Sequence, residues 1–309
     1  MTRGRRTCET ARIAVSTTSV AYTGGTVTIR LAATGATSCT LAVAPTFWSG
    51  RNPVPVACRG SYVARVPRTV LARRWTFRFT ARNRRRQVVV VRQALAQRGD
   101  PNTSSNWSGY VFEGSGITGA RGTFTVPALS PTPGLSDTTE WVGVDGNSDN
   151  TLIQAGIDEE YNPKLGHAVI TPWWEILPAS ETPIPSMPVA VGDSITVAIQ
   201  EQPDLATWQI TETDNTTGQT FATIQPYQGQ QTSAEWIVEA PSIGSSVVTL
   251  GVYAPSVTFS GLSIGLGVPV ALDRLFMVQN DAVVSSPSAF DGAAGAFSVA
   301  YGPNPLPAP

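Results

Sequence analysis

Short segments in which apolar and polar residues alternate, each closed by Gly, Pro, Asn or Asp, run through almost the whole chain. Successive side chains of a β-strand point to opposite faces, so a period of two is the pattern of strands. β-Branched and aromatic residues, which favour strands, are frequent in these segments. The C-terminal two-thirds contain no helical pattern of a dozen residues. The sequence therefore predicts an all-β protein, with strands at 26–32, 38–43, 75–80, 87–91, 107–112, 122–126, 140–145, 151–158, 168–177, 194–200, 208–213, 234–239 and 247–253.

The charge of the chain is divided between two parts. Residues 1–100 contain 18 arginines, no lysine and two acidic residues, Glu9 and Asp100, which gives a net charge of +16. Residues 101–309 contain three basic and 20 acidic residues, a net charge of −17. Such asymmetry indicates two units with different roles. We predict a basic domain over 1–97, a turn-rich linker over 98–105, a large domain over 106–286, and a Pro/Gly/Ala-rich tail over 287–309 that adds little to the core.

The basic part has the strand spacing of a small immunoglobulin-like β-sandwich. Cys39 and Cys58 lie in different segments, and they either form a disulfide or remain two buried thiols, whereas Cys8 lies in a frayed start. The arginines at 82 and 84–86 stand between two strand segments and indicate a solvated hairpin turn. The alternative for this cluster is a nucleic-acid-binding patch, but no interleaved aromatic residues support it. We therefore expect no nucleic-acid partner.

Several kinds of chemistry are excluded by composition. His167 is the only histidine and all three cysteines lie within the first 58 residues, so the acidic part cannot build a histidine or thiolate metal site. We expect no metal and no cofactor, and chemistry that rests on carboxylates, amides or hydroxyls. No aliphatic run exceeds the four residues Val88–Val91, so we expect no membrane insertion. The string Gly261–Gly265 matches the Gly-x-Ser-x-Gly elbow, but Gly267 and Pro269 preclude the helix that this elbow opens.

Four predicted strands of the acidic part each combine an apolar face with a polar or aromatic one. Val142 and Val144, for example, point to one side of their strand, and the residues between them point to the other. The second faces carry, in chain order, Trp141, Asp145, Gln154, Trp173, Glu175 and Glu235. If the four strands are neighbours, these faces form a wide groove lined with Trp, Gln, Asp and Glu. The alternative is an ordinary solvated face.

Six motifs of the acidic part resemble, in the same order, those of the glutamic peptidases, the eqolisin family. They are Asn106-Trp-Ser-Gly109, Phe124-Thr-Val-Pro127, Trp141-Val-Gly-Val-Asp-Gly146, Ile153-Gln-Ala-Gly156, Trp174-Glu175 with Pro178, and Ala234-Glu-Trp-Ile-Val-Glu239. The resemblance covers about residues 102–286. It implies a large antiparallel β-sandwich like that of concanavalin-type lectins, endopeptidase activity at acid pH, and a catalytic Gln and Glu on the concave sheet.

On the matching positions, the resemblance makes Gln154 and Glu235 the catalytic pair. It also implies that five further residues line or support the cleft, and Trp173, which shares a strand face with Glu175, joins them as a substrate-binding residue. The five are Trp107, Trp141, Asp145, Asp158 and Glu175. The chain departs from the best-known members in two respects. Leu177 stands where they have an aromatic residue, and the region has no cysteine where they carry disulfides.

The chemistry suits these residue types. A glutamate that cycles between its two protonation states can serve as general base and then general acid, and a glutamine amide can hold the attacking water and stabilise the oxyanion. Because a glutamate titrates near pH 4.3, we expect an acid optimum without a large pKa shift. The sequence thus predicts an acid endopeptidase that acts on polypeptides, is secreted and is a monomer, although a signal peptide is not evident at the start of the chain.

Two alternatives remain open at this stage. The acidic part is otherwise a carbohydrate-binding or glycan-hydrolysing sandwich that uses carboxylates such as Glu175 and Glu235. The basic part is either a removable prosegment, which contacts the acidic domain through opposite charge at neutral pH, or a permanent accessory domain.

Overall fold

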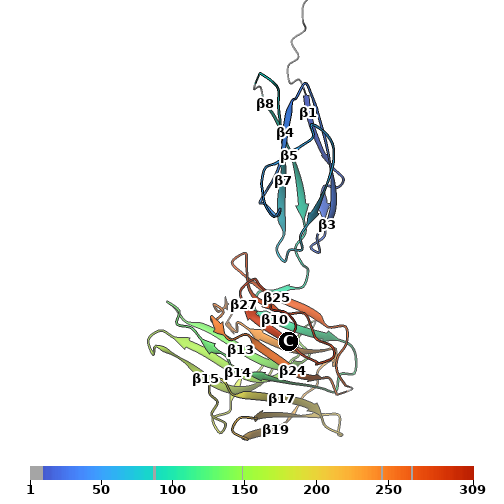
Figure 1. The fold of residues 1–309 in the computed structure, drawn as a ribbon. Helices are drawn as coiled ribbons and strands as arrows, with labels where there is room; N and C mark the ends of the chain where they lie inside the picture. The colour runs from blue at the N-terminus through green and yellow to red at the C-terminus, as the bar shows by residue number, and fades with distance from the viewer. Residues whose placement is uncertain (1–9, 86–87, 148, 245, 266) are drawn as a thin grey trace, which may run out of the picture. The chain divides into compact units, whose positions relative to one another are not determined.

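The computed structural model describes residues 10–85, 88–147, 149–244, 246–265 and 267–309. The basic start of the chain, Cys8 and Arg86 lie outside the described residues. Strands and turns make up this part of the chain and no helix occurs in it, which confirms the all-β prediction (Figure 1). Accordingly, no helix in the described ranges could cross a membrane.

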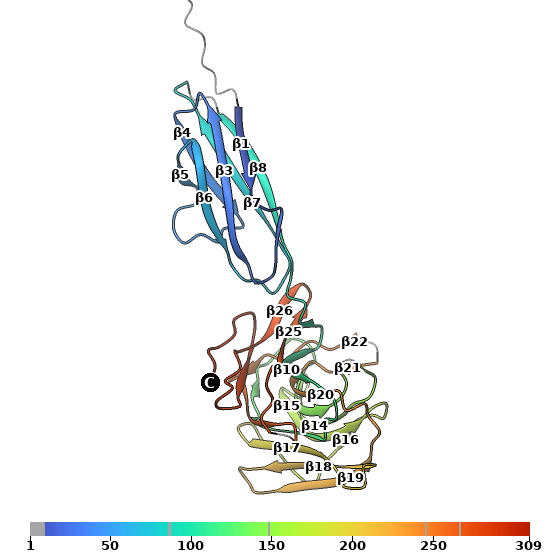
Figure 2. The ribbon, with the colours of Figure 1, turned by 90° about the vertical axis from the view of Figure 1, so that its right-hand side faces the viewer.

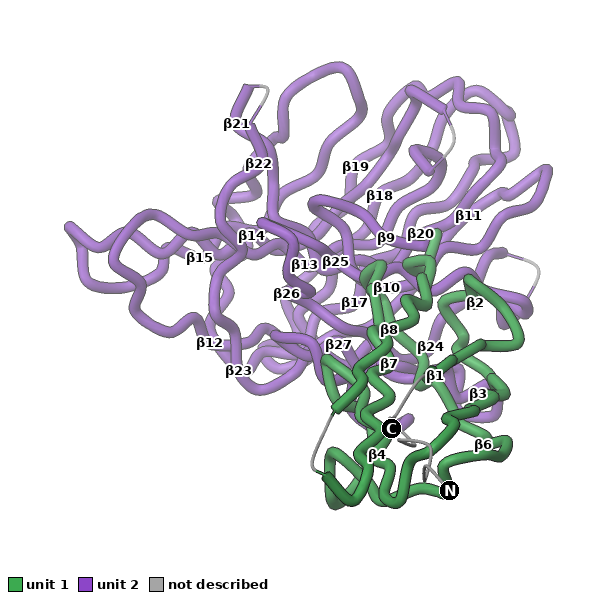
Figure 3. Tube along the Cα trace, turned by 90° about the horizontal axis from the view of Figure 1, so that it is seen from above, with its two compact units in different colours: residues 1–101 green, residues 102–309 purple. Residues whose placement is uncertain are grey.

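The chain divides into two compact units, Met1–Pro101 and Asn102–Pro309 (Figure 3). Unit 1 contains two sheets, with strand orders β1-β3-β6 and β2-β8-β7-β4-β5. All of its strand pairs are antiparallel except β2 with β8. Its strands are β1 (Thr10–Val15), β2 (Ser19–Val20), β3 (Gly25–Thr34), β4 (Ser38–Ala44), β5 (Val54–Val56), β6 (Arg59–Val66), β7 (Arg73–Arg82) and β8 (Val88–Gln97).

Alternate residues of these strands form the core of unit 1. Ile29 of β3, Leu41 of β4, and Phe77 and Phe79 of β7 are completely or almost completely buried between the sheets. Cys39 of β4 forms a disulfide with Cys58, which directly precedes β6. Unit 1 is thus the small two-sheet sandwich that we predicted. Of the two alternatives for Cys39 and Cys58, the structure has the disulfide.

The predicted linker, 98–105, is tied down at both ends. The side chain of the buried Asp100 forms an ion pair with the guanidinium group of Arg68, with 2.8 Å between Nη2 and Oδ2. The backbone N–H of Asp100 donates a hydrogen bond to the Val70 carbonyl. Thr103–Ser104 forms the short strand β9, which pairs in parallel with β25 of unit 2. Most of the predicted linker therefore belongs to one unit or the other, and the boundary falls between Pro101 and Asn102.

Most strands of unit 2 belong to one continuous 15-stranded sheet that folds over on itself, and four short strands form two separate pairs, as counted over the described residues. Its main order is β16-β15-β14-β13-β20-β10-β25-β26-β27-β24-β11-β17-β18-β19. The strands of unit 2 are β9 (Thr103–Ser104), β10 (Trp107–Glu113), β11 (Gly119–Thr125), β12 (Ala128–Leu129), β13 (Ser136–Val144), β14 (Ile153–Asn162), β15 (His167–Ile176), β16 (Thr182–Pro183), β17 (Ser194–Glu201), β18 (Thr207–Asp214), β19 (Thr220–Pro226), β20 (Ser233–Glu239), β21 (Ser242–Ile243), β22 (Ser246–Val247), β23 (Tyr253–Ala254), β24 (Val257–Ser263), β25 (Asp273–Gln279), β26 (Ala282–Pro287) and β27 (Phe297–Tyr301).

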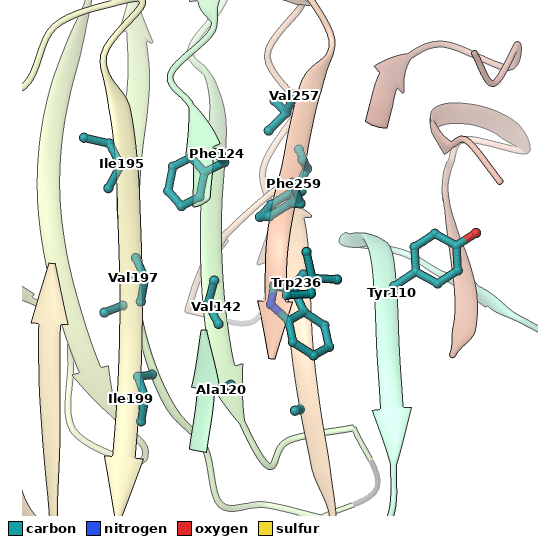
Figure 4. Close-up of a cluster of buried hydrophobic side chains, with 14 of the residues drawn as sticks. Tyr110, Ala120, Phe124, Val142, Ile195, Val197, Ile199, Trp236, Val257 and Phe259 are labelled. Atoms are coloured by element: carbon teal, nitrogen blue, oxygen red, sulfur yellow. The ribbon is translucent and has the colours of Figure 1, made fainter. Parts of the chain in front are cut away.

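We call β15, β14, β13, β20 and β10 the front half of this sheet, and β24, β11, β17, β18 and β19 the back half. In the back half β17, β18 and β19 lie side by side (Figure 2). The main core lies between the halves, because each half turns its apolar face inward. Val142 and Trp236 of the front half and Phe124 and Val197 of the back half are at most 1% exposed and belong to this core (Figure 4). This arrangement confirms the predicted large antiparallel sandwich.

Two predictions about the C-terminal part of unit 2 were wrong. Residues 247–253 do not form one strand, because only Val247 and Tyr253 belong to strands, the short β22 and β23. The tail after residue 287 does contribute to the core. Its residues 297–301 form β27, which pairs with β24 and β26, and Phe297 is completely buried, with its ring stacked on Phe259 at 5.1 Å. The sequence analysis missed this strand because the residues around Phe297 are mostly small, and the composition of the tail therefore did not indicate a strand.

Candidate active site

Gln154 and Glu235 lie on one face of the front half, on either side of Gly143. Gly143 of β13 is the register partner of Gln154 on β14 and also of Glu235 on β20. Directly opposed residues share a face, so the two side chains point to the same side, with their Cα atoms about 10 Å apart across two strand spacings. This face is opposite to the main core, because their neighbours Ile153, Ala155 and Trp236 are core residues. Two residues 81 positions apart in the chain thus meet over a single glycine.

Gly143 leaves room for the side chains of its neighbours. A Cβ atom at this position would lie 2.8 Å from Cζ3 of Trp141 and 3.3 Å from Cβ of Gln154. Glycine in the interior of a strand forgoes a packed side chain, and it often marks a place that another group approaches closely. Here it allows the ring of Trp141 and the side chain of Gln154 to occupy the gap between β14 and β20.

Glu235 is a completely buried carboxyl group. Neither of its side-chain oxygens makes a hydrogen bond of good geometry with a described residue. Burial raises the pKa of Glu235 well above its usual range, the nearby hydroxyl group of Ser233 opposes this rise, and the negative charges of Asp145 and Asp149 add to it. An unpaired buried carboxyl group costs free energy, so its retention calls for a chemical explanation.

Gln154 is oriented by its neighbour on the other side. Its Nε2 donates to Oε2 of Glu175 at 2.6 Å, and Glu175 is its register partner on β15. Burial raises the pKa of Glu175, and the hydrogen bond from Gln154 opposes that rise. The other amide atom, Oε1, is buried and has no partner among the described residues. The amide is therefore held in place while one strong acceptor stays available.

A second carboxyl group organises the tryptophans of this face. Glu239 lies four residues after Glu235, hence on the same side of β20. Its Oε2 accepts a hydrogen bond from Nε1 of Trp141 at 2.7 Å, and its Oε1 accepts one from Nδ2 of Asn106 at 2.8 Å. Burial raises the pKa of Glu239 to about 7, although both hydrogen bonds oppose the rise. The ring of Trp107 meets that of Trp141 edge-on, with 5.0 Å between centroids.

A cavity of about 1000 Å³ opens over these residues. Four of the predicted site residues line it, namely Trp107, Gln154, Trp173 and Glu175. Glu235 and Trp141 do not line it, and both are completely buried in the sheet face beside it. Further apolar lining comes from Leu152, Leu177 and Leu275. Most of the other lining residues are polar, so the cavity is a polar groove with apolar patches at the tryptophans and leucines. The described residues contain no group of three His, Cys, Asp or Glu side chains placed to hold a metal ion.

Comparison with known proteins identifies the second unit. A family model described as the Peptidase A4 family matches residues 105–289, which is more than half of the chain. The chain belongs to the Peptidase A4 family. The resemblance to the eqolisins is thereby confirmed, and the matched range contains all the predicted site residues.

Relatives of this family support the assignment. Aspergillopepsin-2 of Aspergillus niger is 32% identical over 183 residues, which cover 51% of this chain and 63% of that protein. The chain therefore spans less than two thirds of that relative's length. Among solved structures, scytalido-glutamic peptidase with a transition state analog inhibitor superposes with a TM-score of 0.56 at 22% identity, and SCP-B, a member of the eqolisin family in a complex with the tripeptide Ala-Ile-His, with a TM-score of 0.51 at 24% identity. Each match covers 64% of this chain and 98% of the other, and shows a shared fold.

Asp145 and Asp158 lie away from the lining of the cavity in this Peptidase A4 chain. Asp145 is completely buried, and its carboxylate accepts hydrogen bonds from the Tyr227 hydroxyl at 2.7 Å and the Thr232 backbone N–H at 2.8 Å. It thereby fixes the segment that enters β20. Asp158 accepts a hydrogen bond from the Thr139 hydroxyl at 3.0 Å. Neither residue lines the cavity, so of the two roles that the resemblance allows, lining or supporting the cleft, their position is consistent with support.

Sequence reasoning missed two carboxyl groups that line the cavity, Glu181 and Glu239. The signal for Glu239 was present, since it ends the Ala234–Glu239 motif and has the same strand parity as Glu235. Glu181 stands in the loop before β16, where no periodicity assigns a direction to a side chain. Burial raises the pKa of Glu181, and the charges of Asp158 and Glu175 add to that rise.

Proposed function

We propose that this chain is an acid endopeptidase in which Glu235 and Gln154 act on the same water molecule. The observation that supports the proposal most directly is their placement around Gly143, each with a buried oxygen that no other described group satisfies. A water molecule between them would supply the missing partners. Buried polar groups without partners are a feature of catalytic sites.

In the proposed reaction, the Glu235 carboxylate removes a proton from the water, whose oxygen then attacks the peptide carbonyl carbon. The carbonyl oxygen becomes an oxyanion, which an N–H of the Gln154 amide stabilises. Glu235 next returns the proton to the leaving amine as the C–N bond breaks. Glu175 holds the amide through its hydrogen bond and thereby keeps Gln154 in the orientation that the reaction needs.

The raised pKa of Glu235 departs from the ordinary value that we expected, and it suits the second half of this cycle. The acid form has to protonate the leaving amine, and a raised pKa keeps this form abundant through the acid range. Less of Glu235 is then ionised, but its carboxylate is a stronger base because its pKa is higher. The proton that Glu235 gives to the leaving amine is the one that it took from the water, so the reaction begins from the ionised form.

The geometry does not favour the glycan-hydrolysing alternative. Glu175 and Glu235 stand three strand spacings apart in the row Glu175, Gln154, Gly143, Glu235, so their Cα atoms are about 14 Å from each other. Glycosidases need two carboxyl groups that flank one glycosidic bond. Moreover, Gln154 stands between the two carboxyl groups and is bonded to Glu175.

We further propose that the protein acts outside the cell. The Cys39–Cys58 disulfide supports this location, because such bridges persist in oxidising compartments. Titration of free thiols in protein recovered from its native source tests this part. Two reactive thiols at these positions would contradict it.

The function is tested by digestion of a denatured protein at pH 3–5 with the wild type, Glu235→Gln and Gln154→Ala. We expect losses in kcat of about 10²–10⁴-fold for Glu235→Gln and about 10²–10³-fold for Gln154→Ala, with KM changed much less. Glu201→Gln, at the end of β17 in the back half, is the matched control and should retain full activity. Wild-type activity in a folded Glu235→Gln variant would refute the mechanism.

A further inference from the structure

The outer face of the second sheet of unit 1 carries a row of arginines. Along β7 the side chains of Trp75, Phe77 and Phe79 enter the core, so those at 74, 78 and 82 point outward, and all three are exposed arginines. On the next strand, β8, the exposed Arg92 is the direct register partner of Arg78. Four cationic side chains thus share one face of two neighbouring strands.

Within the described residues this charge has no carboxylate to neutralise it. Like charges directly opposite each other on antiparallel strands are destabilising, so the Arg78–Arg92 pair costs free energy. The only ion pair in the described ranges joins Arg68 to Asp100, and Asp100 is the one described acidic residue of unit 1. A face that keeps two opposed arginines is suited to an anionic ligand.

The surface around the pair is hollow. A cavity of about 400 Å³ is lined by Arg78 and Arg92 together with small or short residues, among them Ala42, Ala44 and Thr76. Ala42 is the register partner of Arg78 on β4, so the row across three strands is Ala42, Arg78, Arg92. Small side chains on one flank allow an anionic group to reach both guanidinium groups, which bind carboxylates and sulfates through paired N–H donors.

The row is linear. Arg82 lies eight positions after Arg74, so the three outward arginines of β7 span about 27 Å along the strand. This is the footprint of an extended polymer rather than of a compact ligand. The alternate outward positions of β7 and β8 hold Thr, Val, Ala and Arg but no aromatic residue on which a base could stack, so a single-stranded nucleic acid is the poorer fit.

We propose that this face of unit 1, defined by Arg74, Arg78, Arg82 and Arg92, binds a linear polysaccharide that carries carboxylate or sulfate groups. The Arg78–Arg92 pair with its cavity holds one anionic group, and Arg74 and Arg82 engage further groups along the polymer. In this view unit 1 serves to attach the chain to an anionic matrix. The proposal does not depend on the reaction catalysed by unit 2, because its readout is binding.

The experiment measures retention of the full-length chain on immobilised dextran sulfate, polygalacturonate and uncharged dextran at pH 4 and pH 6.5, over a series of salt concentrations. We expect the wild type to bind one or both anionic polymers and not dextran. Tighter binding of dextran sulfate than of polygalacturonate at pH 6.5, where both polymers are fully ionised, would identify sulfate as the preferred group. The double variant Arg78→Gln/Arg92→Gln should bind at least tenfold more weakly and show a shallower salt dependence.

The matched control is Arg30→Gln/Arg59→Gln, which removes the same charge from exposed positions on β3 and β6 of the opposite sheet. It should weaken binding less than threefold. If both double variants lost binding equally, the overall charge of unit 1 would explain the binding, and the proposal would be overturned. Absence of binding to both anionic polymers, or tighter binding to duplex DNA than to either, would overturn it too. Circular dichroism and an unchanged unfolding midpoint of unit 1 verify that both variants are folded.

Discussion

At the scale of single residues, the site depends on a glycine, Gly143, that stands between two polar residues. Gly143 provides no side chain between Gln154 and Glu235, and each of these has a buried oxygen without a partner in the described part of the chain. Strand alternation orients the two groups, but the glycine decides whether anything fits between them. A position of this kind should be sensitive in activity rather than in folding.

We therefore expect Gly143→Ala to lower kcat by about 10–100-fold while the protein stays folded. The new methyl group would meet Trp141 at 2.8 Å and Gln154 at 3.3 Å, so both side chains must shift. A displacement of about 1 Å in a catalytic group costs about 10²-fold. Steady-state kinetics and thermal unfolding of the variant provide the measurement.

Gly134→Ala is the control, because a methyl group there would meet no atom within 4 Å. It should leave kcat unchanged. If Gly143→Ala were as active as Gly134→Ala, the absence of a side chain at position 143 would have no catalytic importance.

At the scale of strands, three of them carry a carboxyl group on the side that faces the main core. Glu140 of β13, Glu159 of β14 and Glu212 of β18 are at most 1% exposed, among residues such as Ile157 and Ile210. Burial raises the pKa of all three well above the usual range, and the charge of Glu140 raises that of Glu159 further. The sandwich thus encloses groups that are tolerated only when they are neutral.

The sign of these shifts makes the fold of unit 2 an acid-stable one. Because the folded-state pKa of each group lies above its unfolded value near 4.5, the folded protein holds more protons over the interval between them. Their contribution to stability is fully present below about pH 4.5 and is lost as the pH rises through the folded-state pKa. We expect the urea midpoint to be higher at pH 4 than at pH 7.5.

Glu212→Gln should flatten this dependence, since an amide of nearly the same shape does not ionise. The exposed Asp281→Asn is the control and should keep the wild-type slope. Urea titrations at pH 4, 6 and 7.5 compare the three proteins. A wild-type midpoint that does not fall with rising pH would show that the buried carboxyl groups do not limit stability.

At the scale of the whole molecule, each unit has its own hydrophobic core. The core of unit 1 shares no residue with the two hydrophobic clusters of unit 2, and only unit 1 contains a disulfide. We expect calorimetry to resolve two unfolding transitions. The double variant Cys39→Ser/Cys58→Ser should lower the stability of the first unit by about 2–4 kcal/mol, because the bridge closes a loop of about 20 residues.

The transition of unit 2 is the internal control, since this unit has no cysteine. It should keep its midpoint in the double variant, and peptidase activity should be unchanged. A single transition that shifts as a whole would mean that the two cores unfold together.

Much of this architecture was predictable from the sequence because it depends on local periodicity. Alternation assigned Val142, Ile153 and Trp236 to the core, and Gln154 and Glu235 to the opposite face, which is where the structure has them. The division of charge indicated two units. The order of the motifs indicated the family, because each motif is a short local pattern and the family has these patterns in the same order.

Only the tertiary structure decided which strands are neighbours. Register makes Gly143 the shared partner of two distant residues, brings Glu239 to Trp141, and moves Asp145 and Asp158 out of the cavity lining. It also inserts β27 between β26 and β24, although the composition of the tail indicated no strand. The physical reason is that a strand's own residues set which way each side chain points, whereas its hydrogen-bonded partner can come from anywhere in the chain.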